Sequence, residues 1–403
     1  MLKQTFRYLL FLGISGIALP AVAAPTLNEV IEAATQRHPD QKLSTARKQV
    51  SEGYQKQADA WLGGDPAVGL AYWTDEFGGE LGYREAEASL ALPLWLPGQR
   101  KVRHQLADAL QTEGEALSQL LRWRVTGDVL ERIWALQMAE SELLLDIQQL
   151  DSAAALEGAV ARRVEAGELP RSEVLMAQQE LLNREALVQN AQTTLANEQA
   201  AWSSYTGIDT LPAPFTLKPA PLKTVSEQHP LLFLARIRVE RAAARKREVR
   251  IARRNNPVFS LYVKRDRGIE QDPYNDSLGA EITVPFGTST QNAPALAKAS
   301  ELLVKSQATL ARTQRELDLK LIHAQQELER ADKALALAER RNQLAQKRMN
   351  MSQRAFDLGE TDLYLLLQAR EQAVNAARDL KRSQIQRQRA IAQYNLTLGV
   401  VPE

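Results

Sequence analysis

Several absences limit what this 403-residue chain can be. It contains no cysteine, which excludes disulfide bonds, thiolate metal sites, a cysteine nucleophile and a lipid-modified amino-terminal cysteine. Its 50 basic and 49 acidic residues leave a formal net charge of +1, which argues against nucleic-acid binding through phosphate neutralisation. Beyond residue 24, no apolar run approaches the roughly 20 residues that a helix needs to cross a bilayer. Any part of the mature chain that enters a membrane would therefore have to be made of strands.

Enzyme motifs are also missing. The sequence has no phosphate-binding glycine loop, no GxSxG elbow and no HExxH zinc helix. No acid/base pair stands out from the charged helix faces. We therefore expect no enzyme, and we assign no catalytic, cofactor-binding or metal-binding residue.

The amino-terminal segment has the pattern of a secretory signal peptide. Lys3 and Arg7 form a positive region, residues 8–19 are apolar, and an A-x-A cleavage site ends at Ala23. Cleavage would leave Ala24 as the first residue of the mature chain. The apolar segment is too short to span a bilayer as a helix, so we expect an exported protein.

The chain contains the same order of parts twice, at a spacing of about 192 residues. The matching landmarks are His38-Pro39 with His229-Pro230, Gly98 with Gly287, Gly167-Glu168 with Gly359-Glu360, and Gly207 with Gly399. A tandem duplication explains this order. We predict a signal peptide over 1–23, a first repeat over 24–207, a proline-rich linker over 208–222 and a second repeat over 223–403.

Each repeat is predicted to contain a long helical hairpin that turns at its Gly-Glu pair. Glycine and proline are scarce, at 20 and 17 residues, and between Leu317 and Ala338 apolar residues recur at steps of four and three, as in a coiled coil. Helices are expected over 26–61, 100–164, 172–205, 223–255, 290–356 and 362–397. The two longest would each reach roughly 100 Å.

Four short segments alternate between apolar and polar residues. The predicted strands cover about 66–76, 84–96, 257–266 and 276–286. In the second strand, Ala88 and Leu90 share one face while Glu85 and Glu87 share the other, a pattern typical of a strand between lipid and water. A soluble sheet packed on the helices is the alternative. Four strands cannot close a membrane barrel, which needs at least eight, so copies would have to associate. Three copies would supply twelve strands, although this geometry does not exclude a dimer.

Together, these features resemble one known family. They are the signal peptide, the two repeats, the strand ends Pro-Leu-Trp-Leu-Pro-Gly-Gln-Arg (93–100) and Val-Pro-Phe-Gly (284–287), and the segments 174–179 and 365–370 that follow the turns. They resemble the TolC family of outer-membrane efflux proteins over essentially the whole mature chain. The resemblance implies a mainly helical homotrimer whose twelve-stranded barrel contacts the lipids of the outer membrane of a Gram-negative bacterium. Its helical part would lie in the periplasm.

The resemblance also implies partners and docking residues. The open end would meet a periplasmic adaptor (membrane fusion protein) and, through it, an inner-membrane RND-type pump. By position, docking is assigned to Gly167, Glu168, Leu169, Arg171 and Ser172, and to Gly359, Glu360, Thr361, Asp362 and Leu363. These residues also suit plain hairpin turns, because glycine permits a left-handed helix cap and Ser172 or Asp362 suits a helix start. Glu173 lies where some members have a carboxylate at the channel mouth, whereas the second turn has Leu365 at that offset.

The two turns resemble those of the heavy-metal, CzcC-like branch, so heavy-metal cations are the predicted cargo. Drug efflux and type I protein secretion are alternatives with the same fold. The chain chemistry adds no metal site, because the four His residues are scattered, and His38 and His229 are expected to support helix starts before proline.

Two further interpretations concern the surface and the class of protein. The basic run 244–254 is interpreted as a solvated helix face near the strands, in preference to a nucleic-acid or lipid-headgroup patch. Trp73 and Trp95 are predicted to lie near a membrane interface. A periplasmic adaptor or a structural coiled-coil protein is the less favoured class, because an adaptor would have one helical hairpin flanked by β-rich domains.

Overall fold

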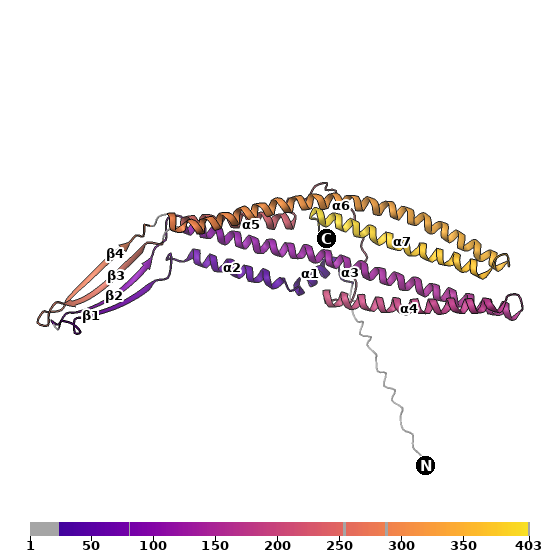
Figure 1. The fold of residues 1–403 in the computed structure, drawn as a ribbon, viewed down its shortest axis with the longest axis horizontal. Coiled ribbons are helices and arrows are strands. Elements are labelled where there is room, and N and C mark those ends of the chain that lie inside the picture. Colours follow the sequence, from indigo (N-terminus) through magenta and orange to yellow (C-terminus); the bar gives the residue numbers. More distant parts are fainter. Residues whose placement is uncertain (1–23, 80, 253–254, 287–288, 402–403) are drawn as a thin grey trace, which may run out of the picture.

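The computed structural model describes residues 24–79, 81–252, 255–286 and 289–401, so the predicted signal peptide, up to Ala23, lies outside the described residues. The molecule is long and narrow, with a helical body and a four-stranded sheet that projects from one end of it (Figure 1). The predicted fold class, mainly helical with long hairpins and four strands per chain, is confirmed.

The elements follow each other in the predicted order. The first set is α1 (Leu27–Arg37), α2 (Gln41–Asp59), β1 (Ala67–Thr74), β2 (Arg84–Pro93), α3 (Gln99–Glu165) and α4 (Arg171–Thr206). The second set is α5 (Pro230–Ile251), β3 (Val258–Arg267), β4 (Asn275–Thr283), α6 (Ser289–Asp357) and α7 (Leu363–Leu398). With 67 and 69 residues, α3 and α6 are each about 100 Å long.

Prolines set several boundaries that the sequence analysis placed elsewhere. The segment 26–61 is two helices, because His38 precedes Pro39 and adopts extended backbone, with φ −65° and ψ 132°. His38 ends α1 and also precedes the start of α2, where its Nδ1 accepts the Asp40 N–H at 3.1 Å and its carbonyl accepts the Gln41 N–H at 2.9 Å. The segment 223–255 becomes helical only at Pro230, where the His229 ring caps the helix by accepting the Leu231 N–H at 3.1 Å.

The second and fourth strands are shorter than predicted. β2 ends at Pro93 and β4 at Thr283, three residues before the predicted ends in both cases. Pro93 and the nearby Pro257 and Pro285 have no N–H to donate to a strand ladder. The first strand, Ala67–Thr74, is also slightly shorter than the predicted range 66–76.

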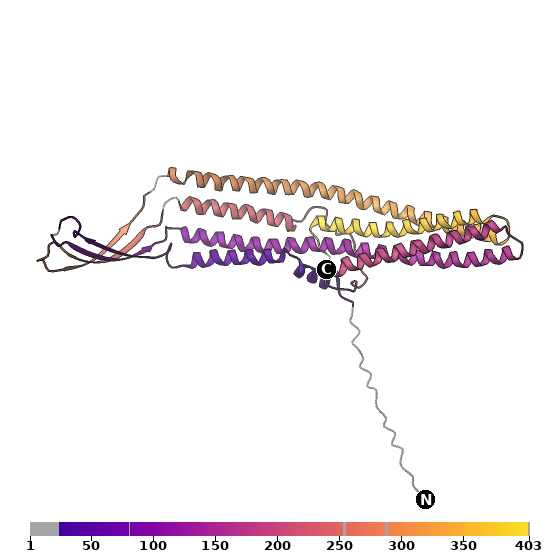
Figure 2. The same ribbon diagram turned by 60° about the horizontal axis from the view of Figure 1, so that its bottom comes forward.

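The helices form one curved row, which Figure 2 shows from a second side. Near the hairpin turns the neighbours run in the order α4, α3, α7, α6, and near the sheet they run α2, α3, α5, α6. The α6–α7 contact uses the predicted coiled-coil seam, in which Leu317, Leu321 and Ala331 are buried. The row has two flanks, one formed by α2 and α4 and the other by α6.

The main apolar core lies at mid-height, where the linker crosses the row. Trp134 and Trp202 are buried there with Ile391 and Leu217. The linker is held on α7 by Asn395, whose Oδ1 accepts the Ala220 N–H at 2.8 Å and whose Nδ2 donates to a linker carbonyl at 2.9 Å. The middle of the molecule is therefore its most compact part.

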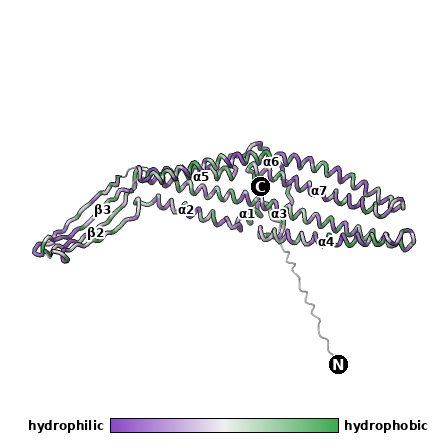
Figure 3. The backbone as a smooth tube through the Cα atoms, in the orientation of Figure 1, coloured by the Kyte–Doolittle hydropathy of each residue, from purple (hydrophilic) through white to green (hydrophobic). Residues whose placement is uncertain are grey.

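Apolar and polar residues are interleaved along the helices and the strands, as the colours of Figure 3 show. Within the described part of the chain, no helix combines the length and the apolar character needed to cross a membrane.

Candidate functional site

The projecting sheet exposes its apolar face. The four strands pair antiparallel in the order β1-β2-β3-β4, and the cross-strand register places Leu70, Ala88, Val263 and Leu278 side by side. Leu70 is 82% exposed and Leu278 79% exposed. No helix packs extensively on either face of the described sheet. A soluble sheet would cover this face with its own helices, so the alternative of a sheet packed on the helical body is wrong.

The opposite face of the sheet is polar. Lys264 Nζ lies 2.9 Å from Glu85 Oε2, and the Tyr83 hydroxyl donates a second hydrogen bond to Glu85. The Tyr262 ring lies against Gly279, where an added Cβ would come within 2.1 Å of the ring. Glycine at this position lets the ring lie flat along the sheet. The sheet therefore has one polar face and one exposed apolar face, the alternation found in strands that separate lipid from water.

The two predicted interface tryptophans do not lie on the apolar face. Trp73 is paired with Glu85 and therefore lies on the polar face, and its position near a membrane interface stays a prediction. Trp95 lies at the junction with the helices, where its Nε1 donates to the Ala60 carbonyl at 3.0 Å and Arg103 stacks 5.0 Å from the ring centroid.

The two hairpin turns at the far end of the body have the same backbone geometry. Gly167 and Gly359 have φ of +79° and +77°. The N–H of Glu168 donates to the Arg163 carbonyl at 2.8 Å, and the N–H of Glu360 makes the equivalent bond to Ala355 at 2.8 Å. These are Schellman caps, in which glycine adopts the left-handed conformation at no steric cost.

The helices that follow the turns start differently. Asp362 caps α7, because its Oδ1 accepts the Leu365 N–H at 2.9 Å. Ser172 has no such role: α4 begins at Arg171 after Pro170, whose fixed φ suits a helix start. The prediction that Ser172 would suit the helix start is therefore wrong.

The assigned docking residues differ in exposure. Those that are exposed in the single chain are Gly167, Glu168, Arg171, Ser172, Gly359, Glu360 and Asp362. Leu169 and Thr361 are half-buried, and Leu363 is fully buried. Glu173 is half-buried in the first turn of α4, with its Oε2 buried and without a hydrogen-bond partner among the described residues.

A side chain from one hairpin joins the two turns. Arg163 Nε lies 3.2 Å from Glu168 Oε2, and Arg163 Nη1 donates to the Phe356 carbonyl of α6 at 3.2 Å. Its guanidinium also lies 5.1 Å from the Phe356 ring centroid. Below it, Phe356, Leu363 and Leu366 pack with residues of α3 and α4 in one buried cluster. The two hairpin turns therefore pack together at one end of the helical body.

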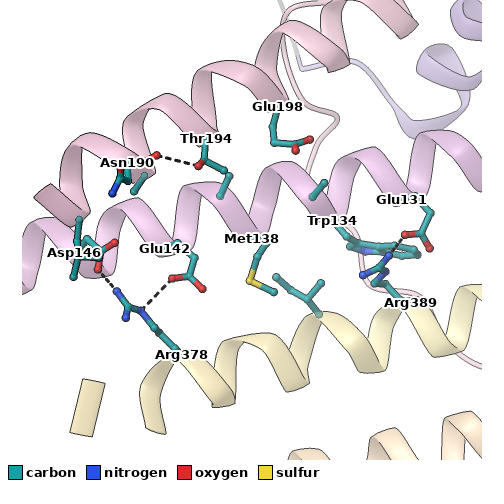
Figure 4. A pocket seen from close by; sticks show the side chains of 15 residues that line it. Glu131, Trp134, Met138, Glu142, Asp146, Asn190, Thr194, Glu198, Arg378 and Arg389 are labelled. Atoms are coloured by element: carbon teal, nitrogen blue, oxygen red, sulfur yellow. Dashed lines mark hydrogen bonds and ion pairs between the residues drawn. The ribbon is translucent and has the colours of Figure 1, made fainter. Parts of the chain in front are cut away.

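Arginines of α7 continue this connection along α3. Arg370 donates to Ser152 Oγ at 3.2 Å and to Gln353 Oε1 at 2.6 Å, and its burial lowers the pKa of its guanidinium from the ordinary value. Arg378 Nε lies 3.1 Å from Glu142, and its Nη2 bonds to Asp146 (Figure 4).

The bridges made by Arg378 and Arg389 line a groove of about 540 Å³ between α3, α4 and α7. Figure 4 shows Met138 and Trp134 between the two arginine bridges, and Arg389 reaching Glu131. Sequence reasoning missed the bridging arginines. Arg163 and the Phe356 carbonyl are 193 positions apart, and Arg389 and Glu131 are 258 apart, so no local pattern pairs them.

Among the described residues, no group of three or more His, Asp or Glu side chains is placed to hold a metal ion. His104 Nε2 lies 3.5 Å from Asp59, and His229 is buried as a helix cap.

The chain is similar to known proteins in structure. No family model matches the chain, and no curated protein sequence matches it. The outer membrane protein VceC from Vibrio cholerae is 17% identical, with a TM-score of 0.74, over 94% of this chain and 97% of that one. The Campylobacter jejuni CmeC outer membrane channel is 15% identical, with a TM-score of 0.72, over 93% and 85%. The open state of the Neisseria gonorrhoeae MtrE outer membrane channel is 17% identical, with a TM-score of 0.70, over 94% and 90%.

The sheet, the helical row and these similarities define the class of fold. The chain has a TolC-like fold, with two long helical hairpins and four antiparallel strands. It covers at least 85% of each of the three chains named above, so the shared fold extends over the whole architecture of strands, helical row and hairpin turns.

Proposed function

We propose that the chain is the outer-membrane component of a tripartite efflux system, in which three copies form a passive channel from the periplasm to the exterior. The observation that carries the proposal is the sheet, which projects beyond the helices with its apolar face exposed. A bilayer would cover that face, and strands spanning it must close into a barrel to satisfy their backbone groups. The outer-membrane proteins with the same fold support this placement.

The barrel would be closed by pairing the two flanks of neighbouring copies. β1 and β4 are the edge strands, and they continue into α2 and α6, the flanking helices near the sheet. Each chain therefore has one flank made of β1, α2 and α4, and another made of β4 and α6. Pairing unlike flanks around an axis forms a ring. Three copies give twelve strands and, at each level, twelve helices, which is wide enough to enclose a channel.

Exposed apolar residues on the flanking helices support this pairing. The exposed apolar residues Leu337, Leu344 and Met351 of α6, and Leu358 just after its end, follow each other at intervals of seven. On α4, Leu175 and Leu182 have the same interval. Such a spacing is the seam of a coiled coil, and seams left open in one chain predict a partner helix.

Charges along the same helices favour unlike flanks. The basic residues beside the α6 seam are Arg340, Arg341, Lys347, Arg348 and Arg354. On α4, four acidic residues, Glu173, Glu180, Glu185 and Glu198, outnumber two basic ones, Arg171 and Arg184, of which Arg184 pairs with Glu180. Opposite charges steer α6 of one copy toward α4 of the next, whereas pairing α6 with α6 would bring like charges together.

The partners and the cargo extend this proposal. A periplasmic adaptor would dock on the exposed turn residues around Gly167-Glu168 and Gly359-Glu360, at the end of the body farthest from the sheet. The adaptor would link the channel to an inner-membrane RND-type pump. Heavy-metal cations are the proposed cargo on the resemblance of the two turns. The channel itself would do no chemistry, since the pump supplies the energy.

Native mass and conductance test the channel. A detergent extract of the outer membrane should contain a heat-sensitive species of about three times the chain mass of 44.9 kDa. The purified species should form ion-conducting pores in planar bilayers. A water-soluble monomer would contradict the proposal. For the cargo, a deletion strain should become sensitive to divalent metal salts, and sensitivity to drugs alone would replace metals with drugs.

A further inference from the structure

A hollow between α5 and α6 has an apolar floor and a cationic rim. It measures about 440 Å³ and lies toward the sheet end of the helices. The lining residues are Arg245, Val249, Ala295, Lys298, Ala299, Glu301, Leu302 and Lys305. Leu302 is 40% exposed although it belongs to the apolar floor. The hollow therefore offers an apolar surface next to positive charge.

Positive charge dominates the rim. Arg245, Lys298 and Lys305 face one acidic residue, Glu301. Arg245 also pairs with Glu248. Lys298 and Lys305 are both exposed and lie two helical turns apart on the same side of α6.

Other cations surround the hollow at the same level. The exposed cations near the sheet ends of the helices are Lys56 of α2, Arg100 and Lys101 of α3, and Arg247 and Arg250 of α5, with the exposed acidic Asp59 of α2 beside them. The first turns of α3 and α6 contain no acidic residue, although the helix dipole favours acids there.

The hollow lies in the part of the helices nearer the strands and extends to Lys305, about 24 Å from the start of α6. The Asn292 amide donates to the Val249 carbonyl at 2.7 Å, which places the start of α6 level with the end of α5. Lys298 is nine residues into α6, about 13 Å along the helix. The strands begin just beyond this end, and residues 65–96 and 256–286 contain eleven acidic and four basic side chains. The cations thus gather at the junction and are not spread over the sheet.

We infer that the hollow binds an anionic phospholipid of the membrane leaflet next to the helices, with the lipid phosphate at Arg245, Lys298 and Lys305. The inference rests on the proposed function, which puts the strands in a bilayer and the helix ends at its periplasmic surface. Clusters of Lys and Arg beside a membrane-spanning segment attract anionic lipid, and the floor of Val249 and Leu302 accepts an acyl chain. The basic run 244–254 then belongs to a lipid-headgroup site, because the structure adds the two lysines of α6 and the apolar floor to it.

Lipid retention by the assembled protein tests the inference. Purified trimers in nanodiscs of mixed phosphatidylethanolamine and phosphatidylglycerol are analysed for bound lipid by native mass spectrometry. The test variant is Arg245→Gln/Lys298→Gln/Lys305→Gln. The matched control is Arg315→Gln/Arg330→Gln/Lys333→Gln, which removes the same charge from exposed positions elsewhere on α6.

The wild type and the control should retain phosphatidylglycerol preferentially. The test variant should lose this preference, by roughly fivefold for each cation removed. Equal retention by the test variant overturns the inference. So does a changed ion selectivity with unchanged lipid retention, which would place the cations in the channel. Conducting trimers without any lipid preference reject this site alone, whereas a chain that forms no membrane-inserted trimer rejects the proposed function as well.

Discussion

At the scale of single residues, His229 couples two distant parts of the chain. It caps α5, its ring lies edge-on to Trp123 with centroids 5.2 Å apart, and it packs against Gly399 at the end of α7. A Cβ added to Gly399 would lie 3.0 Å from the His229 Cα, and Gly399 has a φ of +84°. Both properties require glycine there. At the equivalent repeat positions 38 and 229, the histidine Nδ1 accepts the N–H of the residue two positions later at 3.1 Å, but only His229 is fully buried.

The stability of the chain should fall at acid pH because of His229. Burial lowers the pKa of this imidazole below its ordinary value, and the nearby Lys320 acts in the same direction. Below about pH 6.5 the unfolded chain binds a proton at this position that the folded chain resists, so the free energy of unfolding decreases as the pH falls. The loss ends once the pH is below the pKa of the folded state, and above pH 6.5 His229 contributes no pH dependence.

Thermal unfolding at pH 7.5 and pH 5.0 measures this effect. His229→Asn keeps a capping side chain but does not titrate, so its midpoint should fall less between the two pH values than that of the wild type. Equal decreases in both proteins would show that other groups control the acid sensitivity.

At the scale of elements, each hairpin turn is a stable cap that also presents exposed polar residues. Gly359 has open space around it, with no atom within 4 Å of an added Cβ. A larger residue there would be strained by about 1 kcal/mol from the left-handed backbone but would not clash. This makes the turn a place where a docking surface can be changed without unfolding the helices.

The double variant Gly359→Phe/Glu360→Lys should abolish efflux and leave the trimers intact in the membrane, because it alters the exposed surface at which we propose adaptor docking. Growth on metal salts reports efflux, and unheated gel electrophoresis reports trimers. Glu339→Lys is the control, with the same charge reversal at an exposed position on α6, away from the turn. Loss of the trimers in the double variant would refute the assignment of the turn to docking.

Ion pairs and hydrogen bonds also connect the two hairpins to each other. Asp146 is buried and bonded to Arg378, and Arg163 ties the end of α3 to α6. A buried charge is stable only while its partner is present. These bridges therefore hold the two hairpins in one arrangement, and any change of that arrangement must separate them.

At the scale of the whole molecule, a single row of helices leaves apolar seams uncovered. Leu344 is 67% exposed on α6 and Leu182 is 64% exposed on α4. In the proposed trimer, both would be buried at the contact between copies. Burial of one leucine contributes about 2 kcal/mol, and the contact is repeated three times.

Leu344→Asp should therefore weaken the trimer, and Gln343→Asp should not. Both positions are exposed in the single chain, but only Leu344 lies on the heptad seam. The fraction of trimer at increasing detergent concentration is the measurement. A similar loss for both variants, or for neither, would show that this side of α6 is not the contact between copies.

The sequence alone determined the parts and their order. The long helices, the alternating strands, the glycine caps at Gly167 and Gly359, and the Asp362 cap all depend on residues within a few positions of each other. Periodicity and cap residues report such local interactions directly. The expectation of four strands inside a mainly helical chain was therefore confirmed.

The tertiary structure decided how the parts meet. It placed Trp73 on the polar face, removed Ser172 from the helix start, buried Leu363 between the hairpins, and brought Arg163 to Phe356 and the basic end of α5 to the lysines of α6. Each of these outcomes depends on strand register, on a proline or on a contact between residues far apart in the chain. A one-residue change of register reverses the face of every side chain in a strand, and no local pattern records which distant residue a charge will meet.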